Sequence, residues 1–390
     1  MDAIGLLDII SAGETSKVQF KQTIDNDDSF SAEMIAMSNS KGGIIVIGVK
    51  DKTGEVIGLD YPQLQSFNNR ISNLAHNNIK PQVFIFTEVV SISSGNEDKK
   101  ILVVELSEGI SKPYKDNNGT IWVKQGSDKR RLTDNNEQVR LFQQSGLLYL
   151  DEMIVPNTSV IDVEFDRVKD YVNHIRKDKL LDEIEITKEL LNNLAIIKND
   201  KLSLGGLLFF SKTPQKYRPV FCVKAISFFG NSIGGSDYRN SRDIEGTIPE
   251  MFERTMDFFK SNLSSLQAGQ NFNSVGRLEI SEIALEELLQ NAFVHRDYSK
   301  NSSIRVMIFD NRIEIVSPGA LPNTLTVENV KLGNAVVRNN LLVTYCSKIM
   351  IYRGFGSGIT RAIENQPNIE FTNDVEGEQF KVIIPRLERQ

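Results

Sequence analysis

Three polar residues spaced four apart, Glu287, Asn291 and His295, could carry chemistry on one helix. At about 100° per residue they fall on the same arc as the apolar Ala284 and Leu288 of a helix predicted over 279–295. A carboxylate, an amide and an imidazole within an apolar stripe are costly unless a partner satisfies them. Two explanations stay open from this spacing: a bound ligand or metal, or a buried hydrogen-bond network with neighbouring strands.

The residues that follow this helix favour the ligand. Segments 303–309 and 312–316 alternate around Asp310-Asn311, which predicts a β-hairpin. Later, a Gly-x-Gly-x-Gly run at 354–358 leads into a helix predicted over 359–364. Glycines let backbone N–H groups approach an anion, and a helix N-terminus adds partial positive charge, although a flexible turn explains such a run equally well. The sequence has no Gly-x-x-x-x-Gly-Lys-[Ser/Thr] P-loop, which excludes a Walker-type ATPase.

Three features together resemble the nucleotide-binding module of the GHKL ATPase superfamily, which includes gyrase and histidine kinases. They are the pair Glu287-x-x-x-Asn291, the hairpin with its Pro318-Gly319 exit, and the glycine run. The resemblance implies that Glu287 activates the attacking water and that Asn291 holds Mg²⁺ beside ATP or ADP. One departure is Ser317, which stands where the superfamily has the aspartate that recognises adenine. The nucleotide-binding residues implied are Asn291, His295, Arg296, Gly319, Arg338, Gly354, Gly356 and Gly358. Arg296 and Arg338 are candidate phosphate ligands, with pairing to a nearby acid as the alternative for each.

A narrower likeness covers stretches 291–298, 313–319 and 338–341. These are similar to a divergent GHKL branch attached to Schlafen AlbA_2 domains in bacterial proteins described as transcriptional regulators or ATP-binding proteins. Stretches 13–21 and 34–51 are similar to the AlbA_2 pattern itself. The likeness therefore covers both ends of the chain.

Some Schlafen proteins cut RNA with three carboxylates, and the matching positions here are Glu14, Gln19 and Asp51. A glutamine offers no anionic oxygen to a divalent cation, so the site has only two acids. This favours a binding domain over a metal-dependent nuclease. A purely structural role, in which Glu14 and Asp51 cap a helix and a turn, is the alternative.

A basic segment over 112–131 has six cations against two acids, a local balance of +4. With Trp122 available to stack on a base, this segment could follow a DNA or RNA backbone, although a solvated face and a core tryptophan would look the same. The AlbA_2 resemblance favours nucleic-acid contact. The nucleic-acid-binding residues expected are Lys21, Lys112, Lys115, Trp122, Lys124, Lys129, Arg130 and Arg131.

The length of 390 residues predicts two or three domains. We expect an α+β protein with an AlbA_2-like α/β domain at 1–146, a helical and α/β middle region at 147–275 and a GHKL-like α/β sandwich at 276–390. Within the middle region, the apolar run at 204–210 predicts a buried strand, 220–229 another strand and 249–263 a helix.

Composition excludes several classes of protein. The net charge of −6 excludes a globally basic nucleic-acid coat, and Cys222 and Cys346, 124 residues apart, form no disulfide framework. The three histidines are scattered, so a multi-histidine metal site is not expected. No apolar run is long enough to cross a membrane, and the start of the chain lacks the cation of a signal peptide, so we expect a cytoplasmic protein.

These observations predict a nucleic-acid-binding transcriptional regulator whose GHKL-like module binds a nucleotide and thereby gates its conformation. The alternative is a Schlafen-like metal-dependent nuclease acting on RNA or DNA, for example in defence against phage, with Glu14 and Asp51 as ligands. A third alternative is a scaffold in which both modules only pack. Weak ATPase activity is open, and the resemblance implies a homo-oligomer.

Overall fold

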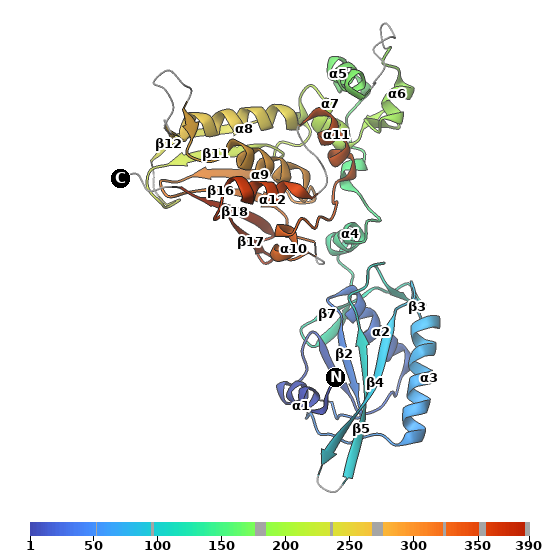
Figure 1. The fold of residues 1–390 in the computed structure, drawn as a ribbon. Helices are drawn as coiled ribbons and strands as arrows, with labels where there is room; N and C mark the ends of the chain where they lie inside the picture. The colour runs from blue at the N-terminus through green and yellow to red at the C-terminus, as the bar shows by residue number, and fades with distance from the viewer. Residues whose placement is uncertain are drawn as a thin grey trace. The chain divides into compact units, whose positions relative to one another are not determined.

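The computed structural model describes residues 1–51, 53–94, 97–175, 185–234, 237–266, 276–322, 325–350 and 356–386. The chain divides into two compact units, Met1–Leu148 and Tyr149–Gln390 (Figure 1). Helices and strands are mixed in both units, which confirms the α+β class.

The N-terminal unit is built on a four-stranded sheet of order β1-β2-β5-β4, in which β1 and β2 are parallel and the other neighbours antiparallel. Its elements are α1 (Ala3–Ala12), β1 (Val18–Lys21), α2 (Asp27–Asn39), β2 (Gly43–Ile47), α3 (Tyr61–Asn77), β3 (Ile79–Lys80), β4 (Ile85–Ser94), β5 (Glu97–Leu106), β6 (Lys115–Asp116), β7 (Trp122–Gln125), β8 (Asp128–Arg131) and α4 (Asn135–Gln144).

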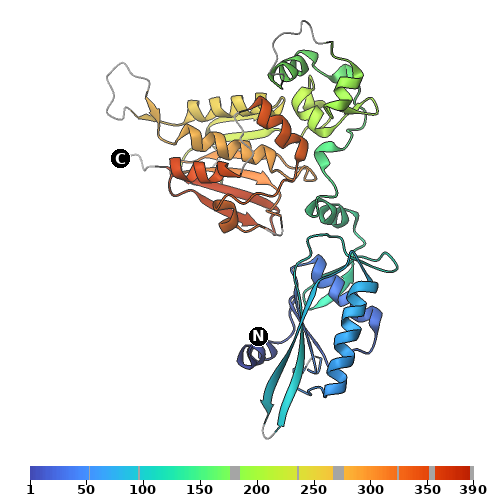
Figure 2. The same ribbon diagram turned by 45° about the vertical axis from the view of Figure 1, so that its right-hand side comes forward.

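Both faces of this sheet are covered because successive strand residues point to opposite sides. Ile45 and Ile47 of β2 pack with α2 and α3, whereas Val46 between them packs with α1 on the other face. A continuous apolar run such as Ile44–Val49 is the expected pattern for a strand buried on both sides. The views in Figures 1 and 2 show these helices on either side of the sheet.

The basic segment folds back onto α2 as the hairpin β7–β8. Asn39, the last residue of α2, donates from Nδ2 to the carbonyl oxygens of Tyr114 (2.8 Å) and Trp122 (2.9 Å) and accepts at Oδ1 from the Tyr114 N–H (2.8 Å). A buried amide that is satisfied at both ends fixes the segment on the helix. One side of this segment is therefore not available to solvent.

The C-terminal unit is built on a six-stranded sheet of order β12-β11-β15-β16-β18-β17, in which only β11 and β15 are parallel. Its elements are α5 (Phe165–Ile175), α6 (Lys188–Asn193), β9 (Ile197–Lys198), β10 (Lys201–Leu202), α7 (Leu204–Phe210), β11 (Val223–Phe228), β12 (Tyr238–Ile244), α8 (Ile248–Asn262), β13 (Ser265–Leu266), β14 (Arg277–Leu278), α9 (Glu282–Val294), β15 (Ile304–Ile308), β16 (Arg312–Pro318), α10 (Val327–Lys331), α11 (Asn340–Ile349), α12 (Ser357–Asn365), β17 (Glu370–Asp374) and β18 (Gln379–Pro385), with short 3₁₀ turns at Leu150–Glu152, Val160–Asp162 and Pro214–Lys216.

Helices α8, α9 and α12 lie on one face of this sheet (Figures 1 and 2). Alternate residues of the central strands, such as Ile313 and Ile315 of β16, join these helices in the main core. The opposite face carries a small cluster around Phe228 and Phe309, whose rings stack with centroids 5.1 Å apart. The sheet therefore holds α9 and α12 against each other over its centre.

Most predicted elements of this half are present. The hairpin closes over Asp310-Asn311, because the Phe309 N–H donates to the Arg312 carbonyl oxygen (2.8 Å). The strand expected at 204–210 is wrong: these residues form α7, with the Ser203 hydroxyl capping the Gly206 N–H (2.9 Å). All seven residues are buried, so no polar face reveals the helical period to the sequence.

Residues 147–275 were expected as a region of their own. In the structure, β11 and β12 of this region belong to the same sheet as β15–β18. The pairing of β11 with β15 joins residues Val223 and Ile304. The two units accordingly meet after Leu148, and β11 and β12 belong to the second unit.

Candidate functional site

A cavity of about 100 Å³ lies beside α9 in the C-terminal unit. Most of the sequence-predicted nucleotide-binding residues line it: Asn291, His295, Gly319, Arg338, Gly356 and Gly358. Glu287, predicted as the residue that activates water, lines it as well. They come from α9, from the exit of β16, from the segment before α11 and from the start of α12. Apolar side chains such as Leu288, Ile315 and Val382 form much of the rest. An apolar cavity with a few convergent polar groups is typical of a small-molecule site.

Glu287 is the charged group at the α9 side of this cavity. Its side chain is 8% exposed, and its Oε1 accepts from Arg361 Nη1 on α12 at 2.7 Å. A Cβ placed on Gly358 would lie 2.7 Å from Glu287 Oε2 and 3.2 Å from Asn291 Nδ2. The glycine therefore lets the first turn of α12 approach both polar residues of α9.

Asn291 has a buried amide nitrogen with no hydrogen-bond partner. A buried polar atom left unpaired costs about 1–3 kcal/mol, so such an atom in a cavity indicates a missing partner. Rotation of the amide exchanges its oxygen and nitrogen, so either a donor or an acceptor can face the cavity. Its side chain can therefore offer an oxygen to a cation or an N–H to an anion.

The exit of β16 forms another wall of the cavity. The Ser317 hydroxyl donates to the Ala292 carbonyl oxygen (3.0 Å), which fixes this end of the strand to α9. Gly319 has φ +100°, and a Cβ there would lie 2.4 Å from the Asp297 Cβ. Glycine is required at this position for both reasons.

His295 and Arg338 lie together at the cavity. Burial, together with the nearby Arg338 guanidinium, lowers the pKa of His295 to about 4, so the imidazole is neutral at pH 7. Arg338 donates to the carbonyl oxygens of Ala320 (2.9 Å) and His295 (3.4 Å). Both hydrogen bonds go to backbone oxygens, and the Asp297 carboxylate nearby attracts the guanidinium, so an anion at Arg338 would share its charge with Asp297.

The remaining two predicted nucleotide ligands have different outcomes. Arg296 lies away from the cavity: it is 1% exposed, it donates to the carbonyl oxygens of Lys300 and Ser302, and it packs over the rings of Phe221 and Tyr298. This buried environment leaves no room for a phosphate at Arg296. Gly354 lies outside the described residues.

The residues present fit an anionic ligand with a cation better than a bare metal ion. Gly356, with φ +73°, caps the N-terminus of α12 at the cavity, where backbone N–H groups and the helix dipole favour negative charge. Within the described ranges no group of three or more His, Cys, Asp or Glu side chains could hold a metal. A Mg²⁺ ion here would need oxygens of the ligand itself, with Asn291 as the protein oxygen.

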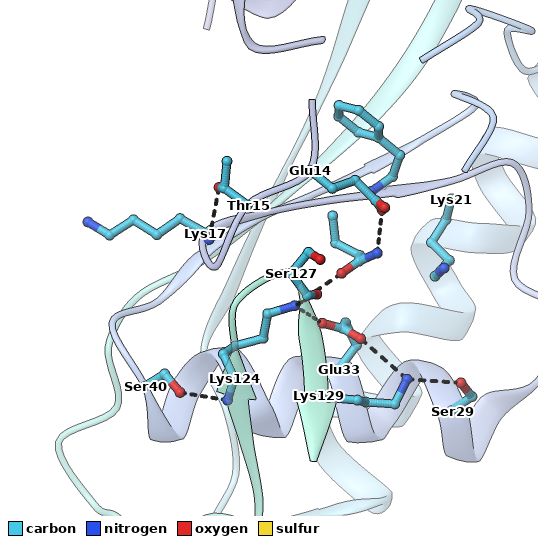
Figure 3. A network of polar contacts seen from close by, with 12 residues as sticks. Glu14, Thr15, Lys17, Lys21, Ser29, Glu33, Ser40, Lys124, Ser127 and Lys129 are labelled. Atoms are coloured by element: carbon cyan, nitrogen blue, oxygen red, sulfur yellow. Dashed lines mark hydrogen bonds and ion pairs between the residues drawn. The ribbon is translucent and has the colours of Figure 1, made fainter. Parts of the chain in front are cut away.

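A second polar site lies in the N-terminal unit, shown in Figure 3. Glu14 Oε1 accepts from the Phe20 N–H at 2.9 Å and from Gln19 Nε2, and Gln19 Oε1 accepts from Lys124 Nζ at 3.0 Å. Lys124 Nζ also donates to Glu33 Oε1 at 2.7 Å and to the Ser127 carbonyl oxygen. An internal ammonium group therefore lies between Gln19 and Glu33.

Asp51, the third residue of the expected nuclease site, is held by a different cation. Its Oδ2 accepts from Lys21 Nζ at 2.6 Å, and its Oδ1 accepts from the Gln22 N–H at 3.2 Å. Glu14 and Asp51 thus each have protein partners of their own. The structure joins Glu14 to Gln19 and Lys124, and Asp51 to Lys21.

The residues expected to bind nucleic acid differ in exposure. Lys112 is buried, with Nζ donating to Glu108 Oε1 (2.5 Å) and the Ser40 carbonyl oxygen (3.0 Å), and Lys124 is buried in the contacts above, so neither cation faces solvent. Lys129 Nζ lies 3.3 Å from Glu33, and Arg130 lies 2.8 Å from Glu137.

Two of the expected cations lie over aromatic rings. Lys115 lies over Phe142, and the exposed Arg131 lies over the half-buried Trp122, 5.3 Å from the ring centroid. The Trp122 Nε1–H donates to Asp116 Oδ2 (3.0 Å). The +4 balance of the segment therefore overstates the charge it presents to a partner.

Two residues of these sites were missed from the sequence. Glu33 lies within the apolar stretch Ala32–Met37, and a lone acid in such a stretch indicates a buried partner. Arg361 lies one turn after Gly358 on α12, and nothing in its spacing alone links it to Glu287, since the pairing depends on how two helices distant in sequence pack.

Comparison with known proteins identifies a family at each end of the chain. Residues 14–133 match the family model described as "Schlafen, AlbA_2", and residues 301–384 match HATPase_c_4, described as "Putative ATP-dependent DNA helicase recG C-terminal". The second match begins after α9. No curated protein matches the chain.

One similar solved structure is the crystal structure of the DIP2311 protein from Corynebacterium diphtheriae. The two chains are 18% identical, with 99% of this chain and 69% of that chain covered and a TM-score of 0.46. This likeness is too low to support conclusions about this protein.

Among the described residues, every helix is too short or too polar to span a lipid bilayer.

Proposed function

Because the chain carries a Schlafen AlbA_2 domain at 14–133 and a HATPase_c_4 domain at 301–384, we propose that the cavity beside α9 binds ATP or ADP with Mg²⁺. The observation that carries this proposal is the position of Asn291. Its unpaired buried amide lines the same cavity as the N-terminus of α12 and Arg338.

Each residue at the cavity has a proposed role. The backbone at Gly356 and Gly358 and the Arg338 guanidinium bind the phosphates, and the Asn291 oxygen contributes one ligand to Mg²⁺. Bound Mg²⁺ supplies charge neutralisation at the phosphates. Glu287 accepts a proton from an attacking water. Apolar side chains near Ser317 receive the base.

We further propose that the N-terminal domain contacts DNA or RNA, so that the whole protein is a nucleotide-gated nucleic-acid-binding regulator. Arg131 and Lys115, beside the Trp122 and Phe142 rings, are the remaining basic contacts of the segment. Nucleotide can change this binding only if it binds one conformation of the protein more tightly than another.

The metal-dependent nuclease is the weaker candidate. Gln19 supplies no anionic oxygen, and its amide oxygen already accepts from Lys124. A cation at Glu14 would have to compete with that internal ammonium group for the same region of negative potential.

Calorimetric titration of ATP and ADP, with and without Mg²⁺, into the full chain tests nucleotide binding. We expect saturable binding that requires Mg²⁺ for full affinity and that Asn291→Ala weakens, whereas Asn340→Ala, an exposed asparagine on α11, leaves it unchanged. Absence of binding to the wild type, or equal binding by both variants, contradicts the proposal.

Fluorescence anisotropy with labelled single-stranded DNA and RNA, at two salt concentrations and with or without nucleotide, tests the proposed gating. We expect affinity that falls steeply with salt and changes when nucleotide is added. Light scattering of the same samples tests the proposed homo-oligomer. Nucleic-acid affinity unaffected by nucleotide contradicts the gating.

A further inference from the structure

Arg361 touches Glu287 from outside the cavity. The two residues lie on neighbouring helices, α12 and α9, which run side by side on the sheet (Figure 2). Arg361 Nη1 is 2.7 Å from Glu287 Oε1, with side-chain exposures of 30% and 8%. Glu287 lines the cavity and Arg361 does not. The Arg361 guanidinium therefore contacts the Glu287 carboxylate from a position that does not line the cavity.

The two carboxylate oxygens of Glu287 have different surroundings. Oε1 accepts the hydrogen bond from Arg361, whereas Oε2 lies near Gly358 in the first turn of α12, a residue that lines the cavity. An ion pair that occupies one oxygen fixes the plane of the carboxylate and leaves the second oxygen free to act. Glu287 is thus oriented before any ligand arrives.

Charge gives Arg361 a second effect on this site. The Glu287 carboxylate, whose side chain is 8% exposed, would repel a polyphosphate bound at the N-terminus of α12. Arg361 counters this repulsion, because its guanidinium offsets the negative charge of the carboxylate on the side away from the ligand.

We propose that Arg361 is a positioning residue for ATP hydrolysis, which holds the Glu287 carboxylate in the orientation of a base. This rests on the proposed nucleotide site. In the reaction, a water oxygen attacks the γ-phosphorus while Oε2 of Glu287 takes the water proton. The bond from the γ-phosphorus to its bridging oxygen breaks, ADP leaves with that electron pair, and inorganic phosphate is the second product.

The test compares kcat for ATP hydrolysis with the Kd for ATP, and the Kd is titrated in the Glu287→Gln background, where the residual turnover is slow but still measurable in a long incubation. Arg361→Ala should lower kcat about tenfold or more, a part of the 10²–10⁴ that a general base contributes, and leave the Kd within about threefold. Arg361→Lys should restore part of the rate. In the Glu287→Gln background, Arg361→Ala should lower the rate no further, because the two residues act as one unit.

Arg312→Ala is the matched control. Arg312 Nε pairs with Glu314 Oε1 at 2.6 Å with side-chain exposures of 25% and 6%, close to those of the Arg361 pair, and neither residue lines the cavity. This variant should leave kcat unchanged. Arg361→Gln, which keeps side-chain bulk, replaces Arg361→Ala if thermal unfolding shows that the alanine variant is not folded.

The outcomes separate the inference from the proposed function. Absence of ATP binding to the wild type overturns the proposed nucleotide site. Binding without hydrolysis, or equal rate losses in Arg361→Ala and Arg312→Ala, leaves that site standing and overturns the role of Arg361. A rate loss that Arg361→Ala also produces in the Glu287→Gln background overturns it as well.

Discussion

Replacing Lys124 with methionine tests whether the polar network of the N-terminal domain holds the hairpin β7–β8 on α2. The Lys124 and Glu33 side chains are only 2% and 4% exposed, and Nζ donates to Glu33, Gln19 and the Ser127 carbonyl oxygen. Methionine keeps most of the volume and removes the charge. Glu33 then remains buried with Lys129, at 3.3 Å, as its remaining cation.

The magnitude follows from this burial. Breaking a buried ion pair by removing one partner costs about 3–5 kcal/mol, because the other charge stays buried without compensation. Lys129 offsets a part of this, so we expect about 3 kcal/mol. Lys129→Met removes a longer contact made by a side chain that is 22% exposed, and should cost about 1 kcal/mol or less.

Urea unfolding of the full chain, followed by tryptophan fluorescence, measures the decrease in the free energy of unfolding of the N-terminal domain. Trp122 is the sole tryptophan of the sequence and lies in β7, two residues before Lys124. With a slope of about 1–3 kcal/mol per molar urea, a loss of 3 kcal/mol moves the midpoint by roughly 1–3 M. Adding Glu33→Gln should recover much of the loss, since the orphaned charge is removed. A Lys124→Met midpoint equal to that of Lys129→Met would refute the reasoning.

Three further predictions concern the two sites and the core. Gln19→Glu places a carboxylate against Glu14, so the variant should be less stable than the wild type at pH 7. Urea unfolding at pH 5 should show a smaller difference in the free energy of unfolding between the two proteins. A difference that is independent of pH contradicts this prediction. Burial raises the pKa of Asp151 to about 6, so ionisation costs stability as pH rises from about 4 to above 6. Calorimetric unfolding of Asp151→Asn should therefore show stability relative to the wild type increasing by about 2 kcal/mol between pH 4 and 7, and parallel pH profiles would contradict the buried charge. Gly358→Ala places a Cβ 2.7 Å from Glu287 Oε2 and should weaken ATP binding about tenfold or more in a calorimetric titration. Unchanged affinity would show that ATP binding does not need the close approach of α12 to Glu287.

The fold was predictable from the sequence where residues repeat with a clear period. The hairpin around Asp310 and the helix with Glu287 both have such patterns, and each is present. The run at 204–210 was not predictable in this way, because it is short and buried on every side. Its assignment as a helix depends on the Ser203 cap and on the close approach of Gly206 to Ile196.

Residues near one another in sequence could be grouped from their spacing, whereas contacts made by packing could not. Spacing alone placed Glu287, Asn291 and His295 on one surface, and Arg338, which the family resemblance had implied, lines the same cavity. The adjacent Arg296 does not line the cavity, because the chain turns after α9 and buries the Arg296 guanidinium against the rings of Phe221 and Tyr298. The count of cations in 112–131 likewise gave no sign that Lys112 and Lys124 face inward.

Hydrogen exchange read by mass spectrometry, on the full chain with and without ATP and Mg²⁺, tests most directly whether the cavity beside α9 is the nucleotide site. We predict slower exchange in the walls of the cavity, at 319–322, 325–338 and 356–359, and loss of this protection in Asn291→Ala. Exchange in these three segments that is the same with and without nucleotide, while calorimetry shows binding, would place the nucleotide elsewhere and contradict the account.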